Sequence, residues 1–417
     1  MNIIPKNNPQ YRWVILVVFV TSQFVLSIAG YGWGPLAPFL KETLSLSRTQ
    51  IGSIGSTFYF TAALSALPAG IIIDRKGVKK GLIAWLGLTG APLLFLGAFK
   101  PSFTIFILMT AIAGLGYGMG NPVCSKGLLM WFDQNTRGTV FGIKQSAVTA
   151  GAAVSGILMV YLSQKMGPFN SLGVIGLVIA LMVILSFYFY KDPTHVGNPS
   201  AYTTTQAATT IFAGFGELFA NKPFLYLATI MGLLGLAQGI VVTFLVLYAG
   251  ESLGYSPLAA GSLLTIVMLS GVVGRIFWGV VSDRLFDGRR RPVLIIISAL
   301  AVLTVMMLAL WGTTAWPRWL FIPVIIGLGL SSVGWNSIAL VMVAEISTAS
   351  KMATAVGLAS TIGWLGLAAG PVAFGSITDH FGYVFAWMTL GIFCFFSLIF
   401  CLFLPVTKRI TTSEDKK

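Results

Sequence analysis

Long apolar runs recur along the whole chain, and each is long enough to cross a lipid bilayer. The first, from Trp13 to Leu40, contains no charged residue in 28 positions. A bilayer core requires roughly 20 predominantly apolar residues per helix. Over the 417 residues, 56% are hydrophobic and only 9% are charged, which excludes an ordinary soluble domain. The sequence therefore predicts a polytopic membrane protein.

Twelve such runs are predicted to be transmembrane segments. Because the bilayer interior offers no partners for backbone hydrogen bonds, repeated spans of this length must be helices. The predicted fold class is thus an all-α membrane protein with twelve transmembrane helices. The first six spans are predicted near residues 13–40, 51–73, 81–99, 102–132, 138–162 and 171–190. The last six are predicted near residues 223–250, 257–282, 292–311, 319–344, 352–377 and 383–405.

The basic residues lie mostly in the connections between the apolar runs. A net charge of +14 is compatible with nucleic-acid binding, but this placement argues for the lipid bilayer as the partner and against nucleic acid. With a cytoplasmic N-terminus, the cytoplasmic segments hold 18 Lys and Arg and the opposite side holds five. Positive charge accumulates on the cytoplasmic side, so both termini are predicted there. The predicted location is the plasma (cell inner) membrane.

The two halves of the chain carry the same motifs in the same order. Residues 70–75 recur as residues 279–284, an offset of 209, with the glycine and the Asp-Arg pair retained. Residues 113–116 recur as residues 326–329, an offset of 213. Such a repeat indicates a duplicated six-helix unit and two pseudo-symmetric bundles.

One long connection separates the two predicted bundles. The N-terminal bundle is predicted over residues 1–190 and the C-terminal bundle, with a cytoplasmic tail, over residues 223–417. Residues 191–222 between them are predicted to be a cytoplasmic linker, since their middle is rich in Thr and Ala.

The connection between the second and third spans has the sequence Gly70-Ile-Ile-Ile-Asp74-Arg75-Lys-Gly77-Val-Lys-Lys. It resembles the signature loop of the major facilitator superfamily, Gly-x-x-x-Asp-Arg-x-Gly-x-Lys-Lys. The resemblance covers essentially the whole chain and implies transport by alternating access. Gly70 is expected to allow close helix approach, Asp74 to cap or pair at a helix end, and Gly77 to supply a tight turn. The implied gating residues are Gly70, Asp74, Arg75, Gly77, Asp283 and Arg284.

Three basic residues lie inside predicted spans: Lys126, Lys144 and Arg275. All twelve acidic residues lie in connections or at helix ends. A cation without a carboxylate at its depth costs several kcal/mol unless it is paired, and a bound anion is the available partner. The alternative is that the long side chains extend to water at the membrane surface. The charge pattern favours a transporter of a small organic anion.

Arg275 is the first candidate for contact with a carboxylate, because a guanidinium forms two parallel hydrogen bonds with it. Residues 270–279 resemble helix 8 of the monocarboxylate and oxalate/formate branches, in which an arginine meets the substrate carboxylate. Residues 131–146 resemble the anion:cation symporter and cyanate-type branches. The two resemblances name different branches, so the subfamily within the superfamily stays open. Thr110 stands where proton-coupled drug exporters often carry an arginine, which argues against an exporter.

Polar and aromatic residues near the middle of the predicted spans complete the candidate substrate site. A buried amide requires partners, so each amide is either a substrate contact or a bond between helices. The candidate substrate-binding residues are Arg275, Lys144, Lys126, Trp335, Asn336, Asn121 and Gln238.

No motif indicates an enzyme, a cofactor or a metal site. His195 and His380 are predicted on opposite sides of the membrane, and the chain has no phosphate-binding loop ending in Gly-Lys-Ser/Thr. We therefore expect a monomeric secondary transporter that works by proton-coupled uptake or by anion exchange. The alternatives are a drug exporter of the same superfamily and an anion channel or transport-like receptor.

Overall fold

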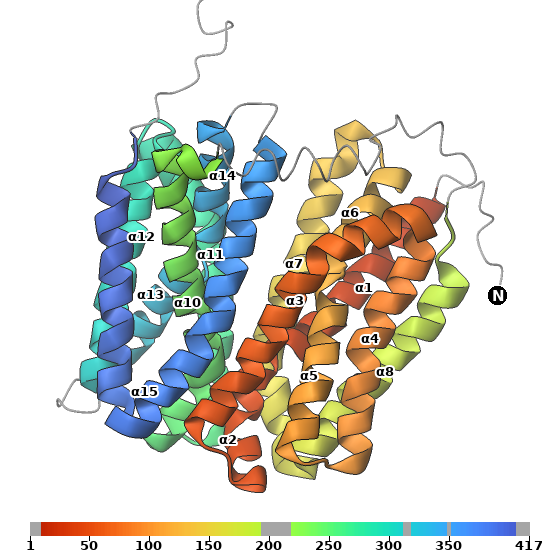
Figure 1. Cartoon of the computed structure of the whole chain (residues 1–417), viewed down its shortest axis with the longest axis horizontal. Helices are drawn as coiled ribbons and strands as arrows, with labels where there is room; N and C mark the ends of the chain where they lie inside the picture. The colour runs from red at the N-terminus through yellow and green to blue at the C-terminus, as the bar shows by residue number, and fades with distance from the viewer. Residues whose placement is uncertain (1–9, 193–217, 312–317, 348–351, 406–417) are drawn as a thin grey trace, which may run out of the picture. The chain divides into compact units, whose positions relative to one another are not determined.

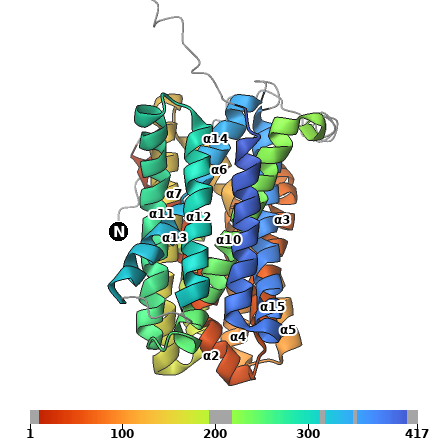
Figure 2. The same cartoon turned by 90° about the vertical axis from the view of Figure 1, so that its left-hand side faces the viewer.

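The computed structural model describes residues 10–192, 218–311, 318–347 and 352–405, and every element in these ranges is a helix (Figures 1 and 2). The elements before residue 192 are α1 (Tyr11–Tyr31), α2 (Trp33–Leu44), α3 (Arg48–Lys76), α4 (Val78–Phe99), α5 (Phe103–Gly118), α6 (Gly120–Trp131), α7 (Gln134–Met166) and α8 (Pro168–Phe189). The later elements are α10 (Lys222–Glu251), α11 (Pro257–Leu285), α12 (Arg290–Trp311), the 3-10 helix η1 (Arg318–Leu320), α13 (Phe321–Ser332), α14 (Asn336–Ile346) and α15 (Met352–Leu402).

The helices account for all twelve predicted spans. In the described ranges, ten segments are long and apolar enough to cross a membrane, if α5 with α6 and α13 with α14 are each counted as one. The helix α3, bent by 49° near Pro68, makes an eleventh. One of the ten is α15, whose 51 residues include Gly382 with φ 82° and ψ 172°. This non-helical residue divides α15 into two arms and brings the number of spans to twelve. The predicted fold class is confirmed.

The chain separates into two compact units. The first unit comprises residues 1–204 together with residues 242–265, and the second comprises residues 205–241 together with residues 266–417. The helices α10 and α11 therefore each contribute residues to both units. The predicted linker at 191–222 lies largely outside the described residues, and the predicted domain boundaries stay predictions.

Glycines allow the helices of each unit to pack at close range. In the first unit, a Cβ added to Gly114 of α5 would lie 2.3 Å from the backbone oxygen of Phe58 on α3. A Cβ added to Gly97 of α4 would lie 2.4 Å from Cα of Gly173 on α8, and Figure 1 shows these two helices side by side. Small residues permit such contacts between membrane helices, where dispersion and hydrogen bonding replace the hydrophobic effect.

Several spans are interrupted within their length. The helices α1 and α2 meet at Gly32, and α5 and α6 meet at Met119. In the second unit, α13 ends at Ser332 and α14 begins at Asn336. Discontinuous helices in transporters free backbone groups near the membrane midplane, where substrates bind. The first turn of α6 carries Asn121, so this candidate stands at such an interruption.

Candidate functional site

The signature loop joins α3 to α4 through Gly77, which has φ 87°. This conformation favours glycine and gives the tight turn expected of that residue. Asp74, on the last turns of α3, accepts a hydrogen bond from Lys126 Nζ on α6 at 2.7 Å. The Lys126 ammonium also donates to the backbone oxygen of Ile73 at 3.3 Å. The expectation that Lys126 has no carboxylate at its depth was therefore wrong, because its ammonium reaches Asp74 near the end of α3.

The repeat of this motif in the second unit is also held by ion pairs. Asp283 at the end of α11 pairs with Arg290 at the start of α12. The Arg290 guanidinium reaches further, with Nε 3.1 Å from Glu345 Oε1 on α14 and one NH2 group 2.9 Å from the Ser282 hydroxyl. Asp283 thus ties α11 to α12, as Asp74 ties α3 to α6. The motif arginines, Arg75 and Arg284, are exposed.

Gly70 does not lie at a close helix contact in this conformation. A Cβ added there would meet its nearest neighbour, Cβ of Pro122 on α6, at 4.0 Å, which is an ordinary van der Waals distance. The expectation that Gly70 permits close approach is therefore not met in this structure.

Lys144 and Asn121 come together inside the first unit. Lys144 lies on α7 and is only 4% exposed, although it carries a long basic side chain. Its ammonium donates to Asn121 Oδ1 on α6 at 2.8 Å. In the part of the chain that the structure describes, no carboxylate lies within ion-pair distance of Lys144. The site therefore combines a buried positive charge with a neutral amide as its hydrogen-bond partner.

The interruption of the fourth span positions Asn121. Because α6 begins at Gly120, Asn121 lies in its first turn, directly after the break from α5 at Met119. The ammonium of Lys144, 2.8 Å from Asn121 Oδ1, favours negative charge at this position. A buried ammonium that bonds only to an amide keeps most of its positive potential. The arrangement suits an anion better than a neutral or cationic ligand.

The remaining candidates lie in the second unit. Arg275 is half-buried on α11, and its backbone oxygen accepts a hydrogen bond from Ser337 of α14 at 3.0 Å. The side-chain amides of Asn336 on α14 and Gln238 on α10 are 3.4 Å apart. The indole N–H of Trp335 donates to the Ser332 oxygen at 3.1 Å. Asn336 and Gln238 therefore form a bond between helices, and Trp335 satisfies a backbone oxygen at the interruption between α13 and α14.

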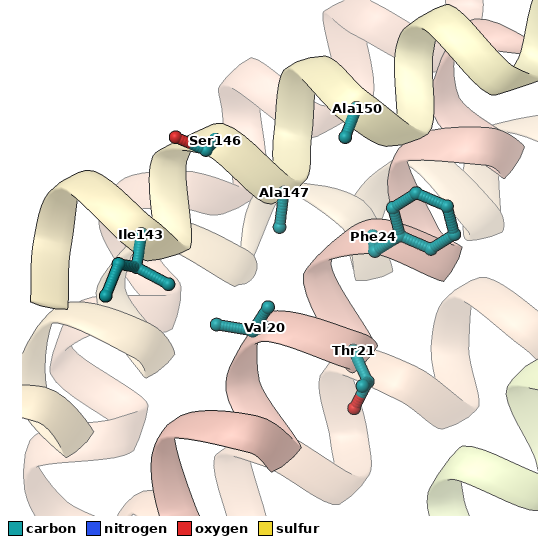
Figure 3. Close-up of a pocket in the computed structure, with 7 residues that line it drawn as sticks. All are labelled: Val20, Thr21, Phe24, Ile143, Ser146, Ala147 and Ala150. Atoms are coloured by element: carbon teal, nitrogen blue, oxygen red, sulfur yellow. The ribbon is translucent and has the colours of Figure 1, made fainter. Parts of the chain in front are cut away.

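A pocket of 310 Å³ lies between α1 and α7 in the first unit (Figure 3). Figure 3 shows Val20 of α1 and Ala147 of α7 directed toward each other across it. Its two hydroxyls, from Thr21 and Ser146, each donate to a carbonyl of their own helix at 2.8 and 3.0 Å. The pocket is therefore largely apolar, and Lys144 does not line it.

Two ionic clusters were not predicted from the sequence. One joins Arg290 to Asp283 and Glu345, and the other joins Glu251 at the end of α10 to Lys41 and Arg48. Glu251 lies 210 residues from Lys41 and 203 from Arg48 in the sequence. No periodicity or local spacing connects residues so far apart, because only helix packing brings them together.

Comparison with known proteins agrees with this architecture. Over residues 19–342, the chain matches the family model described as Major Facilitator Superfamily. It is 24% identical over 396 residues to a probable hexose phosphate transport protein of Chlamydia trachomatis, covering 88% of this chain and 85% of that protein. It is 25% identical over 292 residues to the probable sulfoacetate transporter SauU of Cupriavidus necator, covering 67% of each chain.

Other relatives differ in role or show the fold alone. The membrane sensor protein UhpC of Salmonella typhimurium is 26% identical over 282 residues, covering 64% of each chain. Among solved structures, a bacterial homolog of the human lysosomal transporter Spinster superposes with a TM-score of 0.81 at 14% identity, covering 95% of this chain and 98% of that one. The family match and the transport proteins among the relatives show that the chain is an integral membrane protein for secondary transport and not an enzyme. The chain belongs to the Major Facilitator Superfamily.

Proposed function

We propose that the protein moves a small organic anion across the membrane by alternating access. The observation that carries the proposal is the burial of Lys144 with a neutral amide as its partner. Taking an ammonium out of water costs several kcal/mol, and a single amide oxygen offsets this only in part. A bound anion completes the compensation when the transporter is loaded.

The names of the relatives support an anionic substrate. A hexose phosphate and sulfoacetate are both small organic anions, one with a phosphate group and the other with a sulfonate and a carboxylate. The acidic group proposed from the sequence is a carboxylate. A tetrahedral phosphate or sulfonate would bind the same Lys144 ammonium as a carboxylate. The binding screen therefore has to distinguish the carboxylate, the phosphate and the sulfonate.

In the second unit, Arg275 is the proposed contact for the planar group of a carboxylate, because its guanidinium offers two parallel N–H donors. Gln238 and Asn336 are proposed to bind polar groups of the substrate by exchanging their mutual bond for bonds to it. At 3.4 Å this amide contact is near the upper limit for a hydrogen bond, so its loss costs little.

The proposed coupling follows from the positions of the acidic residues. In the described ranges, Asp74, Asp283 and Glu345 lie near helix ends and already pair with basic residues. A proton would therefore travel on the substrate or on a buried lysine, or else the cycle is anion exchange. The proposed setting is a monomer in the plasma membrane, with both termini in the cytoplasm.

A binding screen tests the proposal. Purified full-length protein is heated in the presence of carboxylates, sulfonates, phosphate esters, and neutral or cationic compounds, because a ligand stabilises the folded state according to its concentration over Kd. Calorimetry on the best anion then compares Lys144→Gln with Lys165→Gln, a control that removes an exposed lysine from the same helix.

Removing one partner of a desolvated charge pair costs about 2–5 kcal/mol, so Lys144→Gln should weaken binding roughly 30- to 5,000-fold. Lys165→Gln should leave the affinity unchanged. Stabilisation by neutral or cationic compounds alone would contradict the proposal. An unchanged affinity in a folded Lys144→Gln protein would also contradict it. The hydrogen bond between Lys144 and Asn121 would then only link α7 to α6.

A further inference from the structure

One face of α11 carries two glycines and an indole at helical spacing. Gly271, Gly274 and Trp278 are buried, whereas Val273 and Ile276 are exposed. Residues three and four positions apart are neighbours on a helix surface, so the three buried residues lie on one face. This face of α11 is therefore directed into the second unit, and its branched apolar side chains point away from it.

The two glycines bring α11 against the interruption between α13 and α14. A Cβ added to Gly271 would lie 2.5 Å from Cβ of Val333. One added to Gly274 would lie 3.2 Å from Cα of Leu330 and 3.3 Å from Cα of Gly334. Because neither position carries a side chain, the backbone of α11 packs closely on residues 330–334.

The interruption displaces the usual partner of the Leu330 carbonyl. In a continuous α-helix its oxygen would accept the N–H of Gly334, four residues later. Here the Gly334 N–H donates to Gly329, five residues back, at 3.1 Å. The Leu330 oxygen accepts the indole N–H of Trp278 at 2.9 Å. Since a carbonyl without a partner is costly inside a membrane, this bond from α11 stabilises the interruption at its present position.

A second bond ties the same stretch of α11 to the first turn of α14. The Ser337 hydroxyl donates to the backbone oxygen of Arg275, three residues before Trp278, at 3.0 Å. The helix α14 begins at Asn336, whose side-chain amide lies 3.4 Å from Gln238 Oε1. The two bonds therefore hold the chain on both sides of the interruption, and together they place Asn336.

We propose that Trp278 is a positioning residue for the substrate site of the second unit. Its indole N–H holds the Leu330 carbonyl and so sets where α14 begins, with Asn336 as its first residue. Trp278 is only 5% exposed and its N–H is already bonded, so it acts through the backbone and not by touching the substrate. The proposal rests on the proposed function, in which Asn336 binds the substrate.

Amide hydrogen exchange on purified full-length protein without ligand is the first test. Trp278→Phe keeps an aromatic ring but removes the donor. Peptides that cover residues 329–337 should then exchange about 3- to 30-fold faster, because the buried carbonyl loses its partner and the local structure opens more often. Trp319→Phe is the matched control, since Trp319 is 73% exposed, and it should leave the exchange of these peptides unchanged.

Unchanged exchange in a folded Trp278→Phe protein, or an equal rise in Trp319→Phe, would overturn the proposal. Should Trp278→Phe fail to fold, Trp278 is replaced by benzothienylalanine, in which sulfur stands in place of the indole N–H. This side chain keeps the two fused rings and removes the same donor, so the same faster exchange is expected. Exchange at the rate of the parent protein would again overturn the proposal.

Binding of the anion found in the screen separates positioning from a purely structural role. Trp278→Phe should weaken binding about 3- to 30-fold and should add little to the loss in Asn336→Ala, because both changes act on the same contact. A lower thermal midpoint with unchanged affinity, or full additivity of the two losses, would overturn the link to Asn336. Faster exchange in Trp278→Phe, with no anion bound by the parent protein, would contradict the proposed function and still support the placement of α14 by Trp278.

Discussion

Lys126 Nζ lies 2.7 Å from Asp74 Oδ1, so the second segment of the interrupted fourth span is tied to the signature loop. One residue, Met119, separates α6 from α5, the first segment of the same span. A movement of α6 that follows substrate binding at Asn121 would therefore reach Asp74 through one side chain. This connection gives Lys126 a mechanical role in the cycle in addition to its charge.

Loss of the Lys126–Asp74 pair should slow transport more than it weakens binding. The side chains are 32% and 50% exposed, so the pair contributes about 0.2–1 kcal/mol. Asp74→Asn and Lys126→Met should each lower the transport rate in proteoliposomes about 2- to 5-fold, with little change in Kd. The exchange Asp74→Lys with Lys126→Asp should restore part of the rate. A loss of affinity in Lys126→Met as large as in Lys144→Gln would instead make Lys126 a substrate contact.

Arg275→Lys should weaken binding of a carboxylate substrate severely while the protein folds normally. A lysine keeps the charge but loses the second parallel hydrogen bond, and truncated charge pairs cost ~2–5 kcal/mol. Lys144→Arg should have a smaller effect, because Lys144 acts mainly through its charge. Calorimetry with the anion found in the screen measures both. Arg284→Lys is the control, since Arg284 is exposed on the same helix. An unchanged affinity in Arg275→Lys would remove Arg275 from the site.

Arg290→Gln should destabilise the second unit. Its guanidinium bonds to Asp283, Glu345 and Ser282 and joins three helices, so the substitution leaves two carboxylates without their partner. With partly exposed partners, we expect a loss of about 1–2 kcal/mol in the free energy of unfolding. Thermal unfolding in detergent measures the change, and Arg284→Gln should lie within about 0.5 kcal/mol of the parent. Equal unfolding of Arg290→Gln and the parent would show that the cluster adds no stability.

Gly114→Ala should destabilise the first unit, whereas Gly87→Ala should not. A Cβ at Gly114 would lie 2.1 Å from the Thr61 hydroxyl and 2.3 Å from the Phe58 oxygen, which forces α3 and α5 apart. A Cβ at Gly87 meets nothing within 4 Å. Overpacking typically costs ~1–3 kcal/mol, while alanine in an open helical position is neutral or stabilising. Comparison of the two thermal midpoints tests the packing directly, and a reversed order would contradict it.

A reporter fused after Lys417 should be found in the cytoplasm, as should cysteine labels placed within residues 191–222. The expectation rests on the asymmetry of 18 basic residues against five between the two sides. Labels at Lys100 or Arg318, in connections predicted on the opposite side, serve as controls. Reaction of both sets from one side of the membrane would contradict the predicted topology.

The spans and the signature loop could be predicted from the sequence because their signals are local. Hydropathy over about 20 residues identifies a span whatever surrounds it, since lipid requires each segment to satisfy its own backbone. The turn at Gly77 follows from the few residues around it. The prediction for Gly70 is not met in this structure for the opposite reason, because a close contact depends on how another helix packs against α3.

By itself, the sequence determined that this chain forms twelve membrane helices in a repeated pattern, and that Lys126, Lys144 and Arg275 are the basic residues within them. Only the tertiary structure decided which partners those charges have. Lys126 reaches Asp74 and Lys144 reaches Asn121 across 52 and 23 residues of sequence. The pairing of Glu251 with Lys41 could not be predicted from the sequence either. The physical reason is that an ion pair depends on distances of a few ångströms between helices, and such distances arise from packing, which no local pattern of residues encodes.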